Sequence, residues 1–316
     1  MTYVLVLGGL VLLAIGGELL VRGAVGMAHI LRISPLLAGL TIVGFGTSTP
    51  ELATSLLAAF EGAPGIAIGN VIGSNISNIL LILGLSALIL PLTVQQSSFR
   101  RDSIALAAST LLCALAVMFG TIGLTMGIIL LVSLVIYIVW AYLSERKPGD
   151  VEGERHIAEA ADTAPRTLNP WLLSAMIIAG LGAAIFGARL LVDGAVELAS
   201  AAGLSEAVIG LTIVAVGTSL PELIACMIAV ARKHPDVALG NVVGSNIYNV
   251  LGILGITSVI HPLQIPAEII RYDIWVLLGV TALLLVQLRS GWQISRKEGA
   301  VLALLFVAYT VFLVVR

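Results

Sequence analysis

The chain has little charge for its length. Of its 316 residues, 11% are Asp, Glu, Lys or Arg and 59% are hydrophobic, and the mean hydropathy is +1.10. About a quarter of the residues in soluble domains are charged, so this composition excludes an ordinary soluble protein and predicts a membrane protein. The net charge of −2 and the lack of a basic cluster give no indication of nucleic-acid binding. Nothing in the sequence implies a protein partner.

Cysteine, histidine and catalytic motifs are scarce as well. The two cysteines, Cys113 and Cys226, stand alone in separate apolar segments, and there are four histidines. Because there is no CxxC and no Cys/His cluster, thiolate metal sites and redox chemistry are disfavoured, and we interpret both cysteines as small buried residues. No HExxH and no GxSxG motif is present. We therefore expect a protein that is not an enzyme and that needs no cofactor.

Long apolar runs dominate the sequence. A helix of about 20 apolar residues spans roughly 30 Å of hydrocarbon, and the first run lacks the basic residues and cleavage site of a signal peptide, so we interpret it as a retained span. Charged residues gather in the stretch 144–169, which we interpret as a solvated linker. Five predicted spans lie on either side of it: about 3–24, 35–60, 66–90, 102–119 and 122–143, then 170–196, 207–231, 237–260, 272–288 and 297–315.

The two halves of the chain repeat each other. A shift of 171 residues aligns 16–92 with 187–263 without a gap, and roughly half of the aligned residues are identical. The predicted division is a first five-helix repeat at 1–143 with its motif core at 39–84, a cytoplasmic linker at 144–169, and a second five-helix repeat at 170–316 with its motif core at 210–255.

The odd number of spans in each repeat predicts an inversion, because the second repeat then enters the membrane from the opposite side. With both termini outside, every lysine and arginine except Arg189, Arg271 and Arg316 falls on the cytoplasmic side, and such a bias sets the orientation of a membrane protein. The predicted fold is an all-α membrane protein of ten transmembrane helices, arranged as two inverted five-helix repeats with interrupted helices at the centre. This plan is typical of secondary transporters.

Each repeat carries a costly motif inside an apolar run, GTSTPE at 46–51 and GTSLPE at 217–222. Pro50 has no N–H, and its ring clashes with the carbonyl four residues earlier, which predicts free carbonyls at residues 44–47 that suit a cation. The serine and glutamate also have the spacing of a capping box that restarts the helix. A buried carboxylate costs several kcal/mol, however, whereas a cap contributes about one. We therefore predict that Glu51 and Glu222 bind an ion.

A second repeated motif places polar side chains on one helical face. GNVIGSNISNIL at 69–80 and GNVVGSNIYNVL at 240–251 space an asparagine, a serine and an asparagine by four residues. We interpret the first asparagine of each motif, Asn70 and Asn241, as a helix-packing residue. The other members of the two faces are Ser74 and Asn78 in the first repeat and Ser245 and Asn249 in the second.

Together the motifs offer carboxylates, hydroxyls, amides and carbonyls. No histidine or cysteine joins them, so the predicted site is an all-oxygen site for a hard cation, large enough for the six to eight oxygens that calcium prefers. Two glutamates supply a charge of −2, which balances one divalent ion or a few monovalent ions. The spacing alone does not select among calcium, sodium, magnesium and protons.

The paired motifs GTSTPE…GNVIGSNISN and GTSLPE…GNVVGSNIYN closely resemble the two α-repeats of the sodium/calcium exchanger (cation/calcium antiporter) superfamily, in the form of a prokaryotic member. The resemblance covers both halves of the chain. It implies a secondary active antiporter in the prokaryotic cell membrane, which exchanges calcium for sodium by alternating access at a central site. The implied partners are calcium ions, sodium ions and the lipid bilayer.

The resemblance also implies roles for individual residues. Glu51 and Glu222 match the carboxylates shared by calcium and sodium, and Thr47 and Thr218 match calcium ligands that act through their carbonyls. The remaining implied ion ligands are the hydroxyls of Ser48, Ser74, Ser219 and Ser245, the amides of Asn78 and Asn249, and carbonyls near Gly44 and Ala215.

The chain departs from parts of the superfamily at defined points. Some members, including those that co-transport potassium, carry an acid where this chain has Asn249. The proton/calcium branch usually reads GNA before its glutamate, and the large cytosolic domains of animal exchangers cannot fit within 144–169. Two alternatives remain from the residues themselves: a proton-coupled exchanger of calcium or another divalent cation, since a buried glutamate can carry a proton, and a cation channel, since acidic rings also attract calcium.

Overall fold

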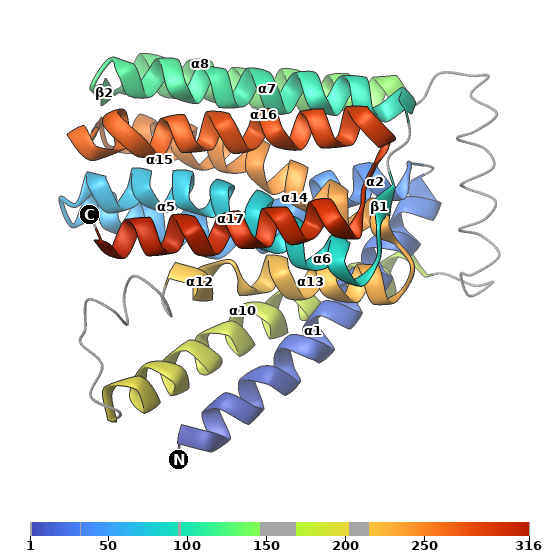
Figure 1. The fold of residues 1–316 in the computed structure, drawn as a ribbon. Coiled ribbons are helices and arrows are strands. Elements are labelled where there is room, and N and C mark those ends of the chain that lie inside the picture. The colour runs from blue at the N-terminus through green and yellow to red at the C-terminus, as the bar shows by residue number, and fades with distance from the viewer. Residues whose placement is uncertain (1, 32, 94–95, 146–168, 202–214, 316) are drawn as a thin grey trace.

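A computed structural model of the protein is almost entirely helical (Figure 1). It describes residues 2–31, 33–93, 96–145, 169–201 and 215–315.

The first half contains both continuous and interrupted helices. Two π-helical turns, η1 and η2, lie within the interrupted ones. The elements are α1 (Thr2–Leu31), α2 (Pro35–Ala38), η1 (Gly39–Val43), α3 (Gly44–Thr47), α4 (Thr49–Phe60), α5 (Pro64–Ser77), η2 (Asn78–Leu83), α6 (Gly84–Ile89), β1 (Leu92–Thr93), α7 (Gln96–Met118), β2 (Thr121–Ile122) and α8 (Leu124–Glu145).

The second half follows the same order where the structure describes it. The predicted span 207–231 lies partly outside the described residues, which resume at residue 215. The elements are α10 (Pro170–Ala201), α12 (Ala215–Thr218), α13 (Leu220–Ala231), α14 (Pro235–Tyr248), η4 (Asn249–Leu254), α15 (Gly255–Ile260), β3 (Leu263–Gln264), η5 (Ile269–Asp273), α16 (Ile274–Gly291), β4 (Gln293–Ile294) and α17 (Arg296–Val315).

Seven helices of the described chain are long and apolar enough to cross a membrane. Of two shorter apolar helices, Leu36–Thr47 ends within the first glutamate motif and Leu220–Ala231 begins within the second, and the helices are interrupted there as predicted. The spans that carry the second motif are the most enclosed, because 72% of the apolar window in Pro64–Ile89 and 78% of that in Pro235–Ile260 is buried, against 22% in Pro170–Gly194. These two spans therefore form the centre of the bundle.

Short strands tie the two halves together at the ends of the helices. β1 pairs with β4 and β2 pairs with β3, both antiparallel. Under the 171-residue shift, β1 corresponds to β3. Each half thus pairs its strands with those of the other half, so the two repeats are intertwined and do not form separate domains.

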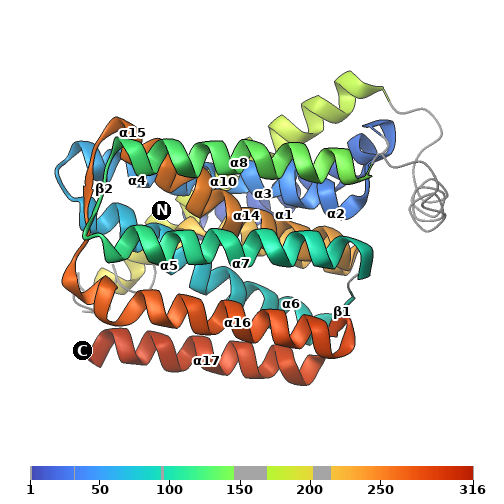
Figure 2. The same cartoon turned by 90° about the horizontal axis from the view of Figure 1, so that it is seen from above.

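The helices α1 and α10 lie side by side and slant away from the rest of the bundle (Figure 1). Seen from above, α7, α8, α16 and α17 run nearly parallel to one another (Figure 2). Near α13, Glu18 of α1 forms ion pairs with Arg22 and with Arg232.

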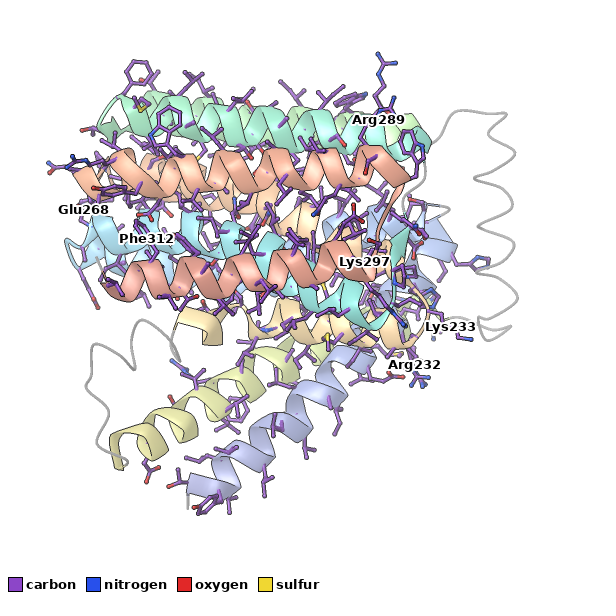
Figure 3. The ribbon with its side chains drawn as sticks, viewed as in Figure 1. Arg232, Lys233, Glu268, Arg289, Lys297 and Phe312 are labelled. Atoms are coloured by element: carbon purple, nitrogen blue, oxygen red, sulfur yellow. The ribbon has the colours of Figure 1, made fainter. Side chains whose placement is uncertain are left out.

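Four basic residues and one acidic residue lie at opposite ends of the bundle. Arg232, Lys233, Arg289 and Lys297 lie at one end, whereas Glu268 lies at the other (Figure 3). The chain begins and ends at the end occupied by Glu268, opposite the four basic residues (Figure 1). This distribution agrees with the charge asymmetry predicted for the two faces of the membrane.

Glycines allow α1 and α10 to approach each other closely. A Cβ atom built on Gly16 would lie 2.5 Å from the backbone nitrogen of Ala184 and 2.8 Å from the carbonyl oxygen of Gly180. Because backbone atoms cannot move aside as a flexible side chain can, only glycine fits at this crossing. Gly8, on the same helix, has nothing within 4 Å of the corresponding position.

We predict that Gly16→Ala destabilises the protein by about 1–3 kcal/mol, because the added methyl group must push two backbones apart. Gly8→Ala is the matched control, and it should be neutral or stabilising by up to about 1 kcal/mol, since alanine favours a helix over glycine. Thermal unfolding of both variants in the same detergent measures the difference. Equal melting temperatures would show that α1 and α10 are not packed this closely.

Candidate ion-binding site

Each glutamate motif sits at a sharp interruption of its helix. Ser48 separates α3 from α4 with φ −79° and ψ 9°, and Ser219 separates α12 from α13 with φ −90° and ψ 9°. Pro50 and Pro221 occupy the first turn of the helices that follow, where a missing N–H is tolerated. The interruption is a kink of a single residue, and it turns the serine side chain away from its own helix.

The predicted capping box is wrong. Neither serine caps its own helix through its side chain. Instead, the Ser48 hydroxyl donates to Glu222 Oε1 at 3.0 Å, and the Ser219 hydroxyl donates to Glu51 Oε1 at 3.2 Å. The physical reason is that a buried carboxylate is a stronger acceptor than a neutral partner and needs a donor more urgently. The two motifs therefore exchange hydrogen bonds between the repeats.

The free carbonyls predicted at residues 44–47 are found only in part. The carbonyl of Gly44 accepts the Ser48 N–H at 3.2 Å and the Ser245 hydroxyl at 3.1 Å, and the carbonyl of Gly46 accepts the Thr49 hydroxyl at 2.7 Å. The prediction is wrong for these two carbonyls. Gly44 keeps its helical donor, the Ser48 N–H, and at Gly46 the Thr49 hydroxyl replaces the N–H that Pro50 lacks.

Both glutamates are buried and incompletely satisfied. Glu51 and Glu222 are each 1% exposed. In each carboxylate one oxygen accepts a serine hydroxyl, while the second oxygen, Oε2, is buried and has no hydrogen-bond partner. A buried ionised oxygen without a partner is costly, so these two atoms are available to a cation.

The last asparagines of the second motif complete the set. Asn78 and Asn249 are 1% and 0% exposed, and each begins a π-helical turn. Their side-chain nitrogens donate to Asn246 and Asn75 of the opposite repeat, while the Oδ1 atoms of Asn78 and Asn249 are buried without a partner. π-helical turns inside α-helices are frequent at functional sites, and here they occur at equivalent positions in both repeats.

Four buried acceptor oxygens thus lack partners at positions related by the repeat: Glu51 Oε2, Glu222 Oε2, Asn78 Oδ1 and Asn249 Oδ1. Hydroxyls such as that of Ser77, which are also without a partner, can rotate and donate, whereas carboxylate and amide oxygens can only accept. Within the described part of the chain, no cluster of three His, Cys, Asp or Glu side chains could hold a metal. The atoms available as metal ligands are therefore carboxylate and amide oxygens, which suit calcium or sodium better than zinc.

Two of the remaining predicted ligands already donate hydrogen bonds through their hydroxyls. The Thr47 hydroxyl lies 3.0 Å from the Val43 carbonyl and 3.2 Å from Asn241 Oδ1, which are both acceptors for its single proton. Ser245 donates to Gly44, and Ser74 is 6% exposed in α5. Thr218 ends α12 and Ala215 begins it.

The hydrogen bonds of Asn70 and Asn241 confirm that both are helix-packing residues. Asn70 Nδ2 donates to the Glu51 carbonyl and to the Ser55 hydroxyl, both at 3.0 Å. Asn241 Nδ2 donates to the Glu222 carbonyl at 3.3 Å and to Cys226 Sγ at 3.1 Å. Each asparagine thereby holds the backbone of a glutamate against the neighbouring helix. Cys226 is buried and forms no disulfide, as predicted.

Two residues escaped the sequence reasoning. Asn75 and Asn246 are 1% and 2% exposed and connect the repeats at the centre of the bundle. They do not lie on the helical face that is formed by the asparagines and serines spaced four residues apart. Their signal was the identical GSN in both motifs, because a second asparagine deep in an apolar helix needs a partner.

Comparison with known proteins identifies this arrangement. The family model described as sodium/calcium exchanger protein matches residues 1–143 and 172–315. The putative antiporter CaxA of Alkalimonas amylolytica is 39% identical over 310 residues, covering 97% of this chain and 96% of its own length. The sodium/calcium exchanger MaX1 of Methanosarcina acetivorans is 32% identical over 366 residues, with 98% of both chains covered.

The fold leads to the same assignment. A solved structure of the sodium-calcium exchanger NCX_Mj, soaked with sodium and strontium, superimposes with a TM-score of 0.83 at 32% identity, covering 97% of this chain and 96% of NCX_Mj. Because the family model matches both halves and the relatives match over nearly the whole chain in sequence and fold, the chain belongs to the sodium/calcium exchanger family of membrane antiporters.

Proposed function

We propose that this protein exchanges calcium for sodium across the membrane by alternating access at one central site. The observation that carries the proposal is the set of four buried acceptor oxygens without partners, two carboxylate and two amide, contributed equally by the two repeats. Acceptors alone cannot satisfy one another, so they call for a bound cation or a proton, and we favour a cation because the two amide oxygens are not protonated in place of an ion.

The charge of the site supports calcium as one of the ions. Glu51 and Glu222 together carry −2 when ionised, which one calcium ion neutralises. Calcium takes six to eight oxygens. We assign the missing ligands to the backbone carbonyls of Thr47 and Thr218. Two or more sodium ions could use the same carboxylates with hydroxyls and carbonyls nearby: those of Ser48, Ser219, Ser74, Ser245 and Ala215. The Gly44 carbonyl would join them only if it gave up the hydroxyl of Ser245.

We further propose the ten-span inverted topology, with both termini outside and residues 144–169 in the cytoplasm. Three features support it: the strands exchanged between the halves, the reciprocal hydrogen bonds of the two motifs, and the four basic residues at the end opposite the termini. A reporter fused after residue 150 should behave as cytoplasmic and one fused after residue 316 as external. A cytoplasmic C-terminus would overturn the inversion.

Calcium uptake into proteoliposomes tests the exchange directly. Vesicles loaded with sodium and diluted into sodium-free medium should take up calcium, whereas vesicles without a sodium gradient should not. A pH gradient imposed alone should have no effect. Uptake driven by the pH gradient instead would favour the proton-coupled alternative, and calcium flux that needs no counter-ion would favour a channel.

The carboxylates can be tested by removing their charge at constant size. We predict that Glu51→Gln and Glu222→Gln each lower sodium-driven calcium uptake at least 100-fold, because the site then no longer balances a divalent ion. Glutamine still accepts the serine hydroxyl, so insertion and melting temperature should stay near those of the wild type. Leu57→Gln, at an exposed position of α4, is a control for the same side chain outside the site. Unchanged uptake by both glutamine variants would remove the glutamates from the site.

Potassium should not be required for transport. An amide at position 249 offers a dipole but no charge, so the site holds two formal negative charges, which one calcium ion already neutralises. A potassium ion bound in addition would leave an uncompensated charge in a low-dielectric site, which is costly. Calcium uptake should therefore be equal in external potassium and in choline. Uptake that vanished in choline would show that a further ligand balances the charge.

A further inference from the structure

Two asparagines that contribute no oxygen of their own to the candidate site lie between its ligands. Asn75 Nδ2 donates to the backbone carbonyl of Asn246 at 3.2 Å, and Asn246 Nδ2 donates to the backbone carbonyl of Asn75 at 3.5 Å. α5 and α14, which carry them, come from opposite repeats. The two bonds are related by the repeat, so the pair lies where the two halves meet.

Each of these asparagines also accepts a hydrogen bond from a proposed ion ligand. Asn249 Nδ2 donates to Asn75 Oδ1 at 3.0 Å, and Asn78 Nδ2 donates to Asn246 Oδ1 at 3.1 Å. Every side-chain nitrogen and oxygen of Asn75 and Asn246 is thereby used within the four-residue cluster.

The direction of these bonds follows from the two backbone carbonyls. A carbonyl can only accept, so the amide nitrogen of Asn75 must face the Asn246 carbonyl, and its Oδ1 must face the other way. That oxygen in turn requires the nitrogen of Asn249 opposite it, because two facing oxygens would repel. The Oδ1 of Asn249 is therefore left pointing away from Asn75. The Asn75 carbonyl orients the amide of Asn246 in the same way, and Asn246 Oδ1 then orients the amide of Asn78.

The two series of hydrogen bonds end at Asn249 Oδ1 and Asn78 Oδ1, which are buried without partners. If either terminal amide were turned over, its partially positive NH₂ group would take the place of the oxygen. A cation would then be repelled at a point where it is now attracted.

We propose that Asn75 and Asn246 are positioning residues, which fix the amides of Asn249 and Asn78 so that their oxygens face the transported cation. The inference rests on the proposed function for the identity of the ion. Each ligand amide is oriented by an asparagine of the opposite repeat, so neither half builds its amide ligand alone.

Equilibrium binding of radioactive calcium to the purified protein tests the inference without relying on transport. Asn75→Ala should raise the Kd for calcium about 10–100-fold, the usual effect of losing a group that orients a ligand. Asn246→Ala should do the same. Ser86→Ala, which removes another fully buried polar group away from the site, is the control and should leave Kd unchanged.

Double variants separate positioning from a general effect on packing. Because Asn75 acts through Asn249, adding Asn75→Ala to Asn249→Ala should change Kd less than about 2-fold further. Asn75 bonds to Asn249, whereas Asn78 bonds to Asn246. Combining Asn75→Ala with Asn78→Ala should therefore raise Kd by the product of the two separate fold-changes. If Asn75→Ala fails to fold, Asn75→Leu fills a similar volume and permits the same cycle.

The outcomes are distinct. Multiplicative effects for Asn75 with Asn249, or a Kd that Asn75→Ala leaves unchanged, would overturn the positioning role while leaving the proposed function intact. A wild-type protein that binds no calcium would overturn the proposed function itself, and with it this inference.

Discussion

The burial of two carboxylates in an apolar bundle is the constraint on which the rest of the structure depends. Removing an ionised group from water is far more costly than one hydrogen bond can offset. Glu51 and Glu222 nevertheless each receive one serine hydroxyl and keep one oxygen unpaired. Under the proposed function, a bound cation would supply the missing interaction, and an ion that binds only the folded state would also stabilise it. Ion binding and stability would then be coupled at the same atoms.

The neighbouring polar groups follow from the same constraint. Several interactions at the centre cross from one repeat to the other: the serine–glutamate bonds, the four-asparagine cluster and the paired strands. A single repeat would leave its carboxylate without the serine donor and its asparagine amides without their partners in the hydrocarbon. The duplication is thus a requirement of the site, because each half provides the hydrogen bonds that the other half needs.

The backbone is adapted to bring these groups together. α1 and α10 touch through glycines, which remove the side chains that would keep the helices apart. The π-helical turns that begin at Asn78 and Asn249 interrupt otherwise regular helices beside the ligands. A regular α-helix would be more stable by itself. Departures from it are frequent at functional sites, and here they begin at the two asparagines whose side-chain oxygens lack partners.

The sequence by itself determined the membrane class, the internal repeat and the two glutamates that are buried in the bundle. Each of these depends only on residue type and spacing. Hydropathy reports burial in lipid, and a carboxylate repeated within apolar runs is too costly to be incidental. Only the tertiary structure decided which groups meet. Ser48 has the spacing to cap its own helix, yet it donates to Glu222, 174 positions away, and Asn75 and Asn246 become central only where α5 and α14 meet. Periodicity describes the faces of one helix, whereas the partner of a buried polar group is set by how the two repeats pack against each other.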